Sequence, residues 1–458
     1  MANVSDEDVL KSGAQDHSGI AEGDTEGSAY PRTNGSAYPR YVLWILFLVY
    51  VINFVDRQIL SVLLDPIKED LGATDTQMGF LTGFAFALFY TGFGIPIARW
   101  ADRGVRRSII ALGLTVWSAM TAACGFATSF LHLAIARVGV GVGEAAGSPP
   151  AHSLISDYFR PEQRTTAFSV YNFGIPVGVM LGYLAGGWIV EFFNWRVAFF
   201  AAAAPGLVLA VVLRFTVREP PRGRYDGVAA ETEASAAQPS FREVCGFLLS
   251  LRSFVLVSIA AGFSAFASYG FGSWVPAFLG RVHGMGSGEI GTWIGIESGV
   301  GGVLGMLATG LIADRLARRD LRWYVWISAL SIVIYLPFCV AFLLLPDTTM
   351  ALTAYFIPVA LSSVYLAPSL ALIHRLVKPN MRAVASSVAM FFLNLIGMGL
   401  GPQAVGFASD WLAPTYGDES LRYALLMALS SKGIAIALFL LAGASVRSDL
   451  AAQQTSAA

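Results

Sequence analysis

Long apolar stretches constrain this sequence more than any other feature. Twelve of them follow one another along the chain, each close to the length of about 20 residues that a helix needs to cross a bilayer. Only 13% of the residues are charged, against about 25% in a typical soluble domain. The sequence therefore predicts an all-α membrane protein with twelve transmembrane helices. Their approximate bounds are 41–64, 77–98, 108–127, 131–156, 166–191, 197–216, 253–280, 288–313, 322–345, 350–376, 383–409 and 421–446.

The basic residues indicate which connections face the cytoplasm. The connections after even-numbered spans hold nineteen Lys and Arg, and those after odd-numbered spans hold four. Because cytoplasmic loops are enriched in these residues, we expect both termini in the cytoplasm of a multi-pass protein of a bacterial inner (plasma) membrane. The expected organisation is a disordered cytoplasmic tail over 1–40, a six-helix bundle over 41–216, a cytoplasmic linker over 217–252, a second six-helix bundle over 253–446 and a cytoplasmic tail over 447–458.

The two halves of the chain repeat one another. "ARWADRGVRR" (98–107) matches "GLIADRLARR" (310–319) at an offset of 212 residues. Six further identities share an offset of 218, and they pair Pro150, Pro161, Arg164, Ala167, Ser169 and Val170 with Pro368, Pro379, Arg382, Ala385, Ser387 and Val388. A glycine ladder at 178, 182 and 187 recurs at 397, 401 and 406. The repeats predict two pseudo-symmetric six-helix bundles, with a substrate site between them near the middle of the membrane.

The stretch "ARVGVGVGEAAG" (136–147) places two charges inside an apolar span. A charge at the bilayer centre costs roughly 2.5–3.5 kcal/mol even on lenient scales, so it should face a partner or a cavity. Arg137, Glu144 and Ser148 fall on one helical stripe, and the first two lie about 10 Å apart along the axis, too far for a direct pair. We expect both charges to face one cavity, while a structural salt-bridge network is the alternative.

A second pair of intramembrane charges, Asp56 and Arg57, lies in the first span. Adjacent residues point about 100° apart on a helix and cannot share a face. We expect Asp56 to face the cavity, with Asn53 one turn away, and Arg57 to face the cytoplasmic or interhelical side. Lys432, in the last span, is interpreted as a snorkelling or interhelical cation, and Glu297 either as a second protonation site or as a buried structural acid.

Several motifs resemble those of a known family. "ADRGVRR" and "ADRLARR" resemble the signature of the major facilitator superfamily, with Ala98 where glycine is usual, and "NWRVAFF" (194–200) fits the connection between its fifth and sixth spans. Within it, "NFVDRQIL" (53–60), "ARVGVGVGEA" (136–145) and "SPPAHSLISDYF" (148–159) are similar to the Spinster family of lysolipid and sphingolipid transporters. The resemblance implies the major facilitator fold and a single-chain amphiphile, such as a lysophospholipid or a sphingosine-phosphate-like molecule, as cargo.

The candidate residues fall into three groups. The proposed proton carriers are Asp56 and Glu144. The proposed substrate contacts are Arg137, as anchor of an anionic headgroup, with Asn53, Ser148, Tyr269, Trp274, Glu297, Tyr365 and Asn394. A charge latch between the halves at the cytoplasmic helix ends is expected from Asp102, Arg103, Arg107, Asp314, Arg315 and Arg319.

The function expected from these features is proton-coupled secondary transport of an anionic amphiphile by alternating access. A proton-coupled symporter of small organic anions is the alternative, and a membrane sensor that does not transport is a third. The sequence has no P-loop, nucleophile elbow or HExxH motif, so neither an enzyme nor a cofactor or metal is expected. The net charge of −1 gives no basic field for nucleic acid. The expected partners are protons, the substrate and the lipid bilayer, and we expect a monomer.

Overall fold

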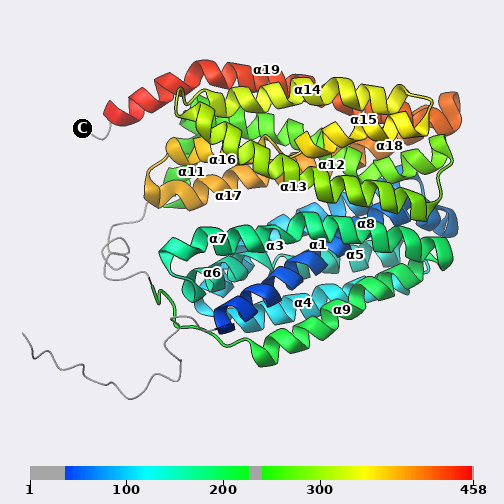
Figure 1. Ribbon diagram of the computed structural model, residues 1–458, viewed down its shortest axis with the longest axis horizontal. Helices are drawn as coiled ribbons and strands as arrows, with labels where there is room; N and C mark the ends of the chain where they lie inside the picture. The colour runs from blue at the N-terminus through cyan, green and yellow to red at the C-terminus, as the bar shows by residue number, and fades with distance from the viewer. Residues whose placement is uncertain (1–36, 226–239, 456–458) are drawn as a thin grey trace, which may run out of the picture. The chain divides into compact units, whose positions relative to one another are not determined.

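The computed structural model describes residues 37–225 and 240–455, and their regular structure is helical throughout (Figure 1). The residues from Val42 onward form one compact unit, and the contacts discussed below lie within it. The helices of the first half are α1 (Ala37–Leu71), α2 (Asp75–Thr82), α3 (Phe84–Arg103), α4 (Arg106–Gly125), α5 (Phe130–Glu144), α6 (Ser148–Tyr158), α7 (Pro161–Asn172), α8 (Gly174–Phe192) and α9 (Trp195–Thr216).

The second half is built in the same way. Its helices are α11 (Phe241–Ser250), α12 (Arg252–His283), α13 (Ser287–Ala317), α14 (Trp323–Leu344), α15 (Thr348–Leu361), α16 (Leu366–Arg375), α17 (Arg382–Phe392), α18 (Gly401–Tyr416) and α19 (Ser420–Thr455), with short segments η1 (Pro379–Met381), η2 (Leu393–Leu400) and η3 (Gly417–Glu419). The described chain contains eleven continuous apolar helical stretches long enough to cross a membrane. The last, Arg382–Ala451, holds two spans separated by η3, which gives the twelve predicted.

The breaks within spans repeat between the halves. The fourth span is interrupted between α5 and α6, and the tenth is interrupted between α15 and α16, at residues related by the offset of 218 found in the sequence. The fifth span breaks at Phe173, and the eleventh contains the π-helical turn η2 near the equivalent position. The breaks in the helices therefore repeat between the halves, so the backbone shows the same repeat as the sequence.

The glycine ladders hold equivalent helices together in both halves. At Gly178, α8 lies so close to α1 that a side chain would collide with the Val51 carbonyl, and at Gly182 it would lie only 3.1 Å from the Val55 carbonyl. At Gly397 and Gly401, η2 and α18 approach α12 in the same way. The third glycine of each ladder joins the two halves, because Gly187 on α8 contacts α13 and Gly406 on α18 contacts α2.

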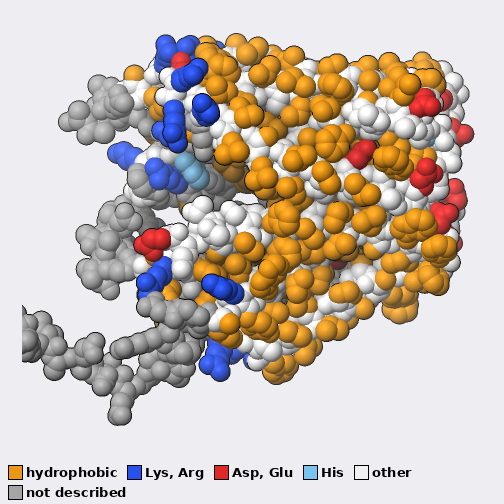
Figure 2. All heavy atoms as spheres, viewed as in Figure 1, with side chains coloured by type: hydrophobic (Ala, Val, Ile, Leu, Met, Phe, Trp, Pro, Cys, Tyr) orange, Lys and Arg blue, Asp and Glu red, His pale blue; other side chains and the backbone are white. Residues whose placement is uncertain are grey.

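Charged side chains gather at the two ends of the helices. Figure 2 shows Lys and Arg at one end and Asp and Glu at the other, with an apolar surface between them. We name the end that carries the α3–α4, α6–α7, α13–α14 and α16–α17 connections the basic end, and the opposite end the acidic end. The surface is hollowed between the two halves at the basic end (Figure 2).

Two segments outside the predicted spans are helical. The linker contains α11, which Ser240 and Glu243 cap reciprocally and which buries Val244 and Leu248, while residues 226–239 lie outside the described chain. Helix α19 continues to Thr455, beyond the expected end of the bundle at residue 446. The N-terminal tail falls outside the described residues up to residue 36.

Candidate functional site

Asp56 on α1 and Arg137 on α5 form a buried pair in the interior of the first half. Arg137 donates from Nη1 to the Asp56 carboxylate at 3.4 Å, and both side chains are at most 3% exposed. Thr121 on α4 donates a short hydrogen bond to the other Asp56 oxygen. Three helices are therefore connected through one carboxylate, and Nε of Arg137 has no partner.

Arg57, the next residue on α1, forms the second pair. Its Nε donates to Oε2 of the fully buried Glu144 at 2.5 Å, while the Arg57 side chain keeps 19% of its surface exposed. Its guanidinium carbon lies 4.9 Å from the ring centre of Phe86 and 4.7 Å from that of Tyr90, within the range of cation–π attraction. The second carboxylate oxygen of Glu144, Oε1, is buried without a hydrogen-bond partner.

These contacts correct the predicted orientation of the first-span charges. Asp56 does not face the cavity, because it is 2% exposed and turned toward α4 and α5. Arg57, not Asp56, has the partly exposed side chain, with 19% of its surface accessible. Arg137, the predicted headgroup anchor, is 2% exposed and bonds Asp56 in this conformation, and its role as anchor stays a prediction. Sequence spacing established that the two first-span charges diverge, but the choice of face depends on α4, which contributes Thr121.

A polar and aromatic wall surrounds Arg57. The rings of Tyr50 and Tyr171 stack at 4.3 Å, and Ser148 faces the hydroxyls of both. Ser148 is partly exposed, whereas Asn53 is 5% exposed and belongs to the interior. Tyr269 on α12 is 38% exposed and faces this region from the second half.

The other predicted contacts in the second half lie in different environments. Trp274 is fully buried and its indole N–H donates to the Pro402 carbonyl at 2.9 Å, so it packs α12 on α18 instead of lining a cavity. Tyr365 is 5% exposed and its ring lies beside Lys432. Asn394 is half-buried on η2. Glu297 on α13 is 6% exposed, and its Oε2 has no hydrogen-bond partner.

The expected latch residues are not paired across the halves in this conformation. Asp102, Arg103, Arg315 and Arg319 are exposed, and none takes part in an ion pair within the described chain. Arg107 bonds within its own half, donating to the Val217 carbonyl and to Glu219. The side chain of Asp314 lies outside what the structure describes.

A charge network that the sequence analysis missed joins the halves at the acidic end. Arg281 on α12 donates to Asp65 at 2.5 Å and to Asp75 at 2.7 Å. Lys68 also bonds Asp75 at 2.7 Å, and Asp410 on α18 accepts hydrogen bonds from Thr76. Arg281 and Lys68 appeared in the sequence only as basic residues of odd-numbered connections, and no motif marks them. We name Arg281, Asp65 and Asp75 the acidic-end lock.

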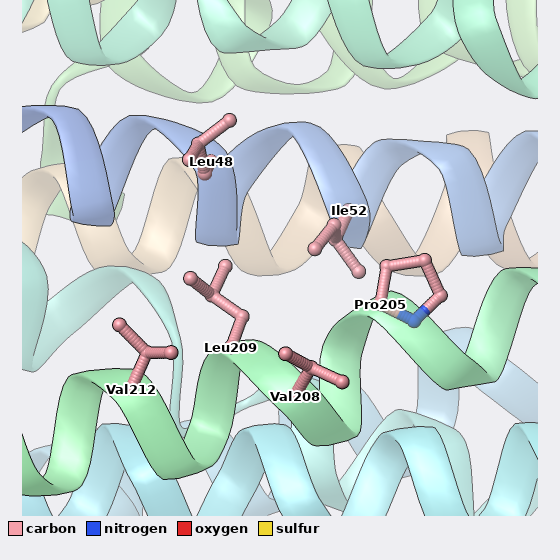
Figure 3. A pocket seen from close by; sticks show the side chains of 6 residues that line it. All are labelled: Leu48, Ile52, Pro205, Val208, Leu209 and Val212. Carbon is pink, nitrogen blue, oxygen red and sulfur yellow. The ribbon is translucent and has the colours of Figure 1, made fainter.

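The surface groove between α1 and α9 is apolar. Figure 3 shows Leu48 and Ile52 of α1 facing α9, whose side chains complete the lining, and the volume is about 360 Å³. Its other lining residues are Pro205, Val208, Leu209 and Val212. Since no charged or hydrogen-bonding side chain lines it, this groove is separate from the charged site and suits only a hydrocarbon chain.

Comparisons with known proteins agree with the fold. A model of the Major Facilitator Superfamily matches residues 46–402. The chain is 37% identical to an MFS-type efflux pump of Mycolicibacterium smegmatis, over 89% of this chain and 93% of the relative. It is 28% identical to protein spinster homolog 1 of Xenopus tropicalis over 84% and 77%. It is 26% identical to the cis,cis-muconate transport protein of Acinetobacter baylyi over 80% and 86%.

A solved structure is similar over almost the whole chain. It is a bacterial homologue of the human lysosomal transporter Spinster in an inward-facing and unoccupied conformation. The TM-score is 0.82 and the sequence identity 32%, with 90% of this chain and 98% of that chain covered.

Proposed function

Because the chain belongs to the Major Facilitator Superfamily, and is therefore a membrane transporter and not an enzyme, we propose that it moves an anionic amphiphile across the inner membrane in exchange for, or together with, protons. The basic end is the cytoplasmic end in this proposal, since basic connections favour the cytoplasm. The open hollow then faces the cytoplasm, and the acidic-end lock closes the path to the periplasm.

One observation carries this proposal: a partly exposed arginine side chain bonded to a fully buried carboxylate. Arg57, whose Nε holds Glu144 at 2.5 Å in this conformation, can release this carboxylate and turn its donors toward a phosphate or carboxylate headgroup. The rings of Phe54, Phe86 and Tyr90 lie 4.7–5.3 Å from the Arg57 guanidinium carbon. They provide apolar surface for the first methylenes of a chain attached to that headgroup. Arg57 therefore replaces Arg137 as the anchor.

The pair also supplies a mechanism for coupling. An anionic headgroup and Glu144 compete for the same guanidinium. When the headgroup binds Arg57, Glu144 is left buried with Oε1 already unpartnered, and an unpaired buried carboxylate is stable only after it binds a proton. When the headgroup leaves, Arg57 returns to Glu144 and the proton is released. Asp56 stays paired with Arg137 and Thr121 and keeps the cluster in position.

The amphiphile is favoured over a small organic anion by the similarity to Spinster proteins and by the aromatic wall around Arg57. The muconate transporter among the relatives supports the alternative, a proton-coupled symporter of small organic anions. Both substrates would use the Arg57–Glu144 pair. They differ in whether a hydrocarbon chain adds to affinity.

Binding measurements on the purified protein test the proposal. We expect a lysophosphatidic acid with a long acyl chain to bind at least ten times more tightly than cis,cis-muconate, and Arg57→Gln to weaken this binding at least tenfold. The matched control is Arg322→Gln, which removes a guanidinium that bonds only Asp320 outside the membrane spans and should leave affinity unchanged. Equal affinity for the two ligands would favour the organic-anion symporter, and full affinity in a folded Arg57→Gln protein would refute the anchor.

A further inference from the structure

Lys432 on α19 is a buried cation in the second half of the molecule. The residue is 1% exposed. Its Nζ donates to the hydroxyls of Ser264 and Ser268 on α12, at 3.0 and 2.9 Å. The rings of Tyr335 and Tyr365 lie 4.4 and 5.6 Å away. All of these neighbours are neutral.

Lys432 differs in this respect from the large cations elsewhere in the protein. Arg57, Arg106, Arg137 and Arg281 each have at least one carboxylate partner. In the described chain no carboxylate lies within ion-pair distance of Lys432. A buried ammonium without a counter-charge loses most of its hydration and regains little in return. Arginine would stay charged at such a site, whereas lysine can become a neutral amine.

The hydrogen-bond partners of Nζ suit both forms of the side chain. An ammonium has three donors and no acceptor, and a serine hydroxyl can accept from it. An amine has a lone pair, and the same hydroxyl can rotate and donate to it. Ser264 and Ser268 can therefore satisfy Lys432 with or without its extra proton, which a carboxylate or a carbonyl could not do.

Ser268 also connects Lys432 to the surface. Its side chain is partly exposed, next to the exposed Tyr269, and its hydroxyl can donate to the Ser362 carbonyl at 3.1 Å. Ser264, in contrast, is fully buried. Of the two hydroxyls bonded to Nζ, that of Ser268 is therefore the one on a partly exposed residue.

The remaining ionisable groups around Lys432 do not fix its charge. Tyr335 and Cys339 face it from α14, and Tyr365 faces it from the start of α16. Helix α12 contributes charged residues only at its ends, where Arg281 belongs to the acidic-end lock. The carboxylates of α18 and α19, Asp410 and Asp449, accept hydrogen bonds from backbone amides of α2 and α12.

We propose that Lys432 is a second proton-binding site, located in the C-terminal half and exchanging its proton with water through Ser268. In the uptake step, Ser268 Oγ receives a proton from water and passes its own hydroxyl proton to the lone pair of Nζ. The release step is the reverse. The role of this proton in coupling rests on the transport function proposed above, but its binding does not.

Lysine-selective NMR of the substrate-free protein tests the proposal directly. The chain has four lysines, Lys11, Lys68, Lys378 and Lys432, so ¹³Cε labelling gives four signals, and Lys432→Gln identifies the one of interest. We expect the Lys432 signal to move between the ammonium and amine positions across a pH range in which free lysine remains an ammonium. A Lys432 signal that stays at the ammonium position throughout this range would overturn the proposal.

The exchange path has its own test. Ser268→Ala removes the partly exposed hydroxyl and leaves Ser264 bonded to Nζ. We expect the titration of Lys432 to persist while proton exchange at Nζ slows at least tenfold, measured by line broadening in the same spectra. The matched control is Ser430→Ala on the exposed face of α19, whose hydroxyl bonds only Met427 and should not affect the exchange. Unchanged exchange in Ser268→Ala would refute the path through Ser268.

Discussion

Arg57 and Arg137 carry the same charge but differ in burial and in the carboxylate that each bonds. Arg137 lies inside the first half and bonds Asp56, which also joins α4. Arg57 keeps 19% of its side chain exposed and bonds Glu144. The first pair is built to stay together, because both members are buried. The second can open, because one member is exposed to a competing anion.

Glu144→Gln tests the pair that can open. A glutamine keeps the shape of the protonated acid and takes no proton, so we expect anionic amphiphile to bind with wild-type affinity or better. Binding should no longer vary with pH, and a proton gradient should no longer drive transport in liposomes. Conserved pH dependence in this variant would mean that another group carries the coupled proton.

Arg137→Met tests the pair that stays closed. It leaves Asp56 buried without a counter-charge, and breaking a buried pair costs about 3–5 kcal/mol. We expect a large fall in the thermal unfolding midpoint. In the Asp56→Asn/Arg137→Met double variant no isolated charge remains, so at least half of the loss should be recovered. Equal destabilisation in the single and double variants would contradict a mainly electrostatic role.

At the scale of elements, the broken spans and glycine ladders position these pairs. The fourth span ends its first helix at Glu144, so the carboxylate is at the break between α5 and α6. The ladder on α8 brings that helix against α1, and its last glycine brings it against α13 in the other half. Close approach at Gly187 is therefore part of the contact that closes the acidic end.

Gly187→Ala should weaken that closure. A side chain there would collide with the Ser287 carbonyl and the backbone of Gly291, and both are parts of a helix that cannot give way locally. We expect α8 and α13 to separate, and the labelling of cysteines introduced at the acidic end to increase several-fold. Gly433→Ala on α19 is the matched control, since nothing lies within 4 Å of the added carbon. Similar labelling in both variants would exclude a specific role for the contact between α8 and α13 at Gly187.

The number of spans and the divergence of Asp56 and Arg57 could be predicted because both follow from local sequence, and the repeat could be predicted because identical residues recur at fixed offsets. Partner choice could not, because it depends on which helices pack together. Thr121 is an ordinary polar residue of the third span until α4 places it beside Asp56. Arg281 and Asp75 lie 206 residues apart in the chain. The sequence around Trp274 is compatible with an aromatic residue that lines a cavity. In the structure its indole donates to the Pro402 carbonyl, and the side chain packs between helices.

At the scale of the whole molecule, the two ends are closed by different charges. The acidic-end lock is formed here, while the exposed latch residues of the basic end are not paired across the halves. A transporter that opens alternately at the basic and the acidic end requires the acidic-end lock and the latch residues to compete. Each set of charges stabilises only the conformation in which its own end is closed. The equilibrium between the conformations can then be shifted from either end.

Arg281→Gln and Asp102→Asn should shift this equilibrium in opposite directions. The first removes charge-assisted hydrogen bonds to Asp65 and Asp75, and a loss of about 1.4 kcal/mol already changes a ratio of populations tenfold. We expect Arg281→Gln to open the acidic end, Asp102→Asn to favour the conformation seen here, and the double variant to lie between them. Distances between pairs of spin labels measure the two openings. One pair is at Phe193 and Tyr416, both exposed near the acidic end, and the other is at Gln163 and Lys378, both exposed near the basic end. Cys245 is replaced by serine to prevent labelling there. If both variants moved the distances in the same direction, the two sets of charges would not be competing locks.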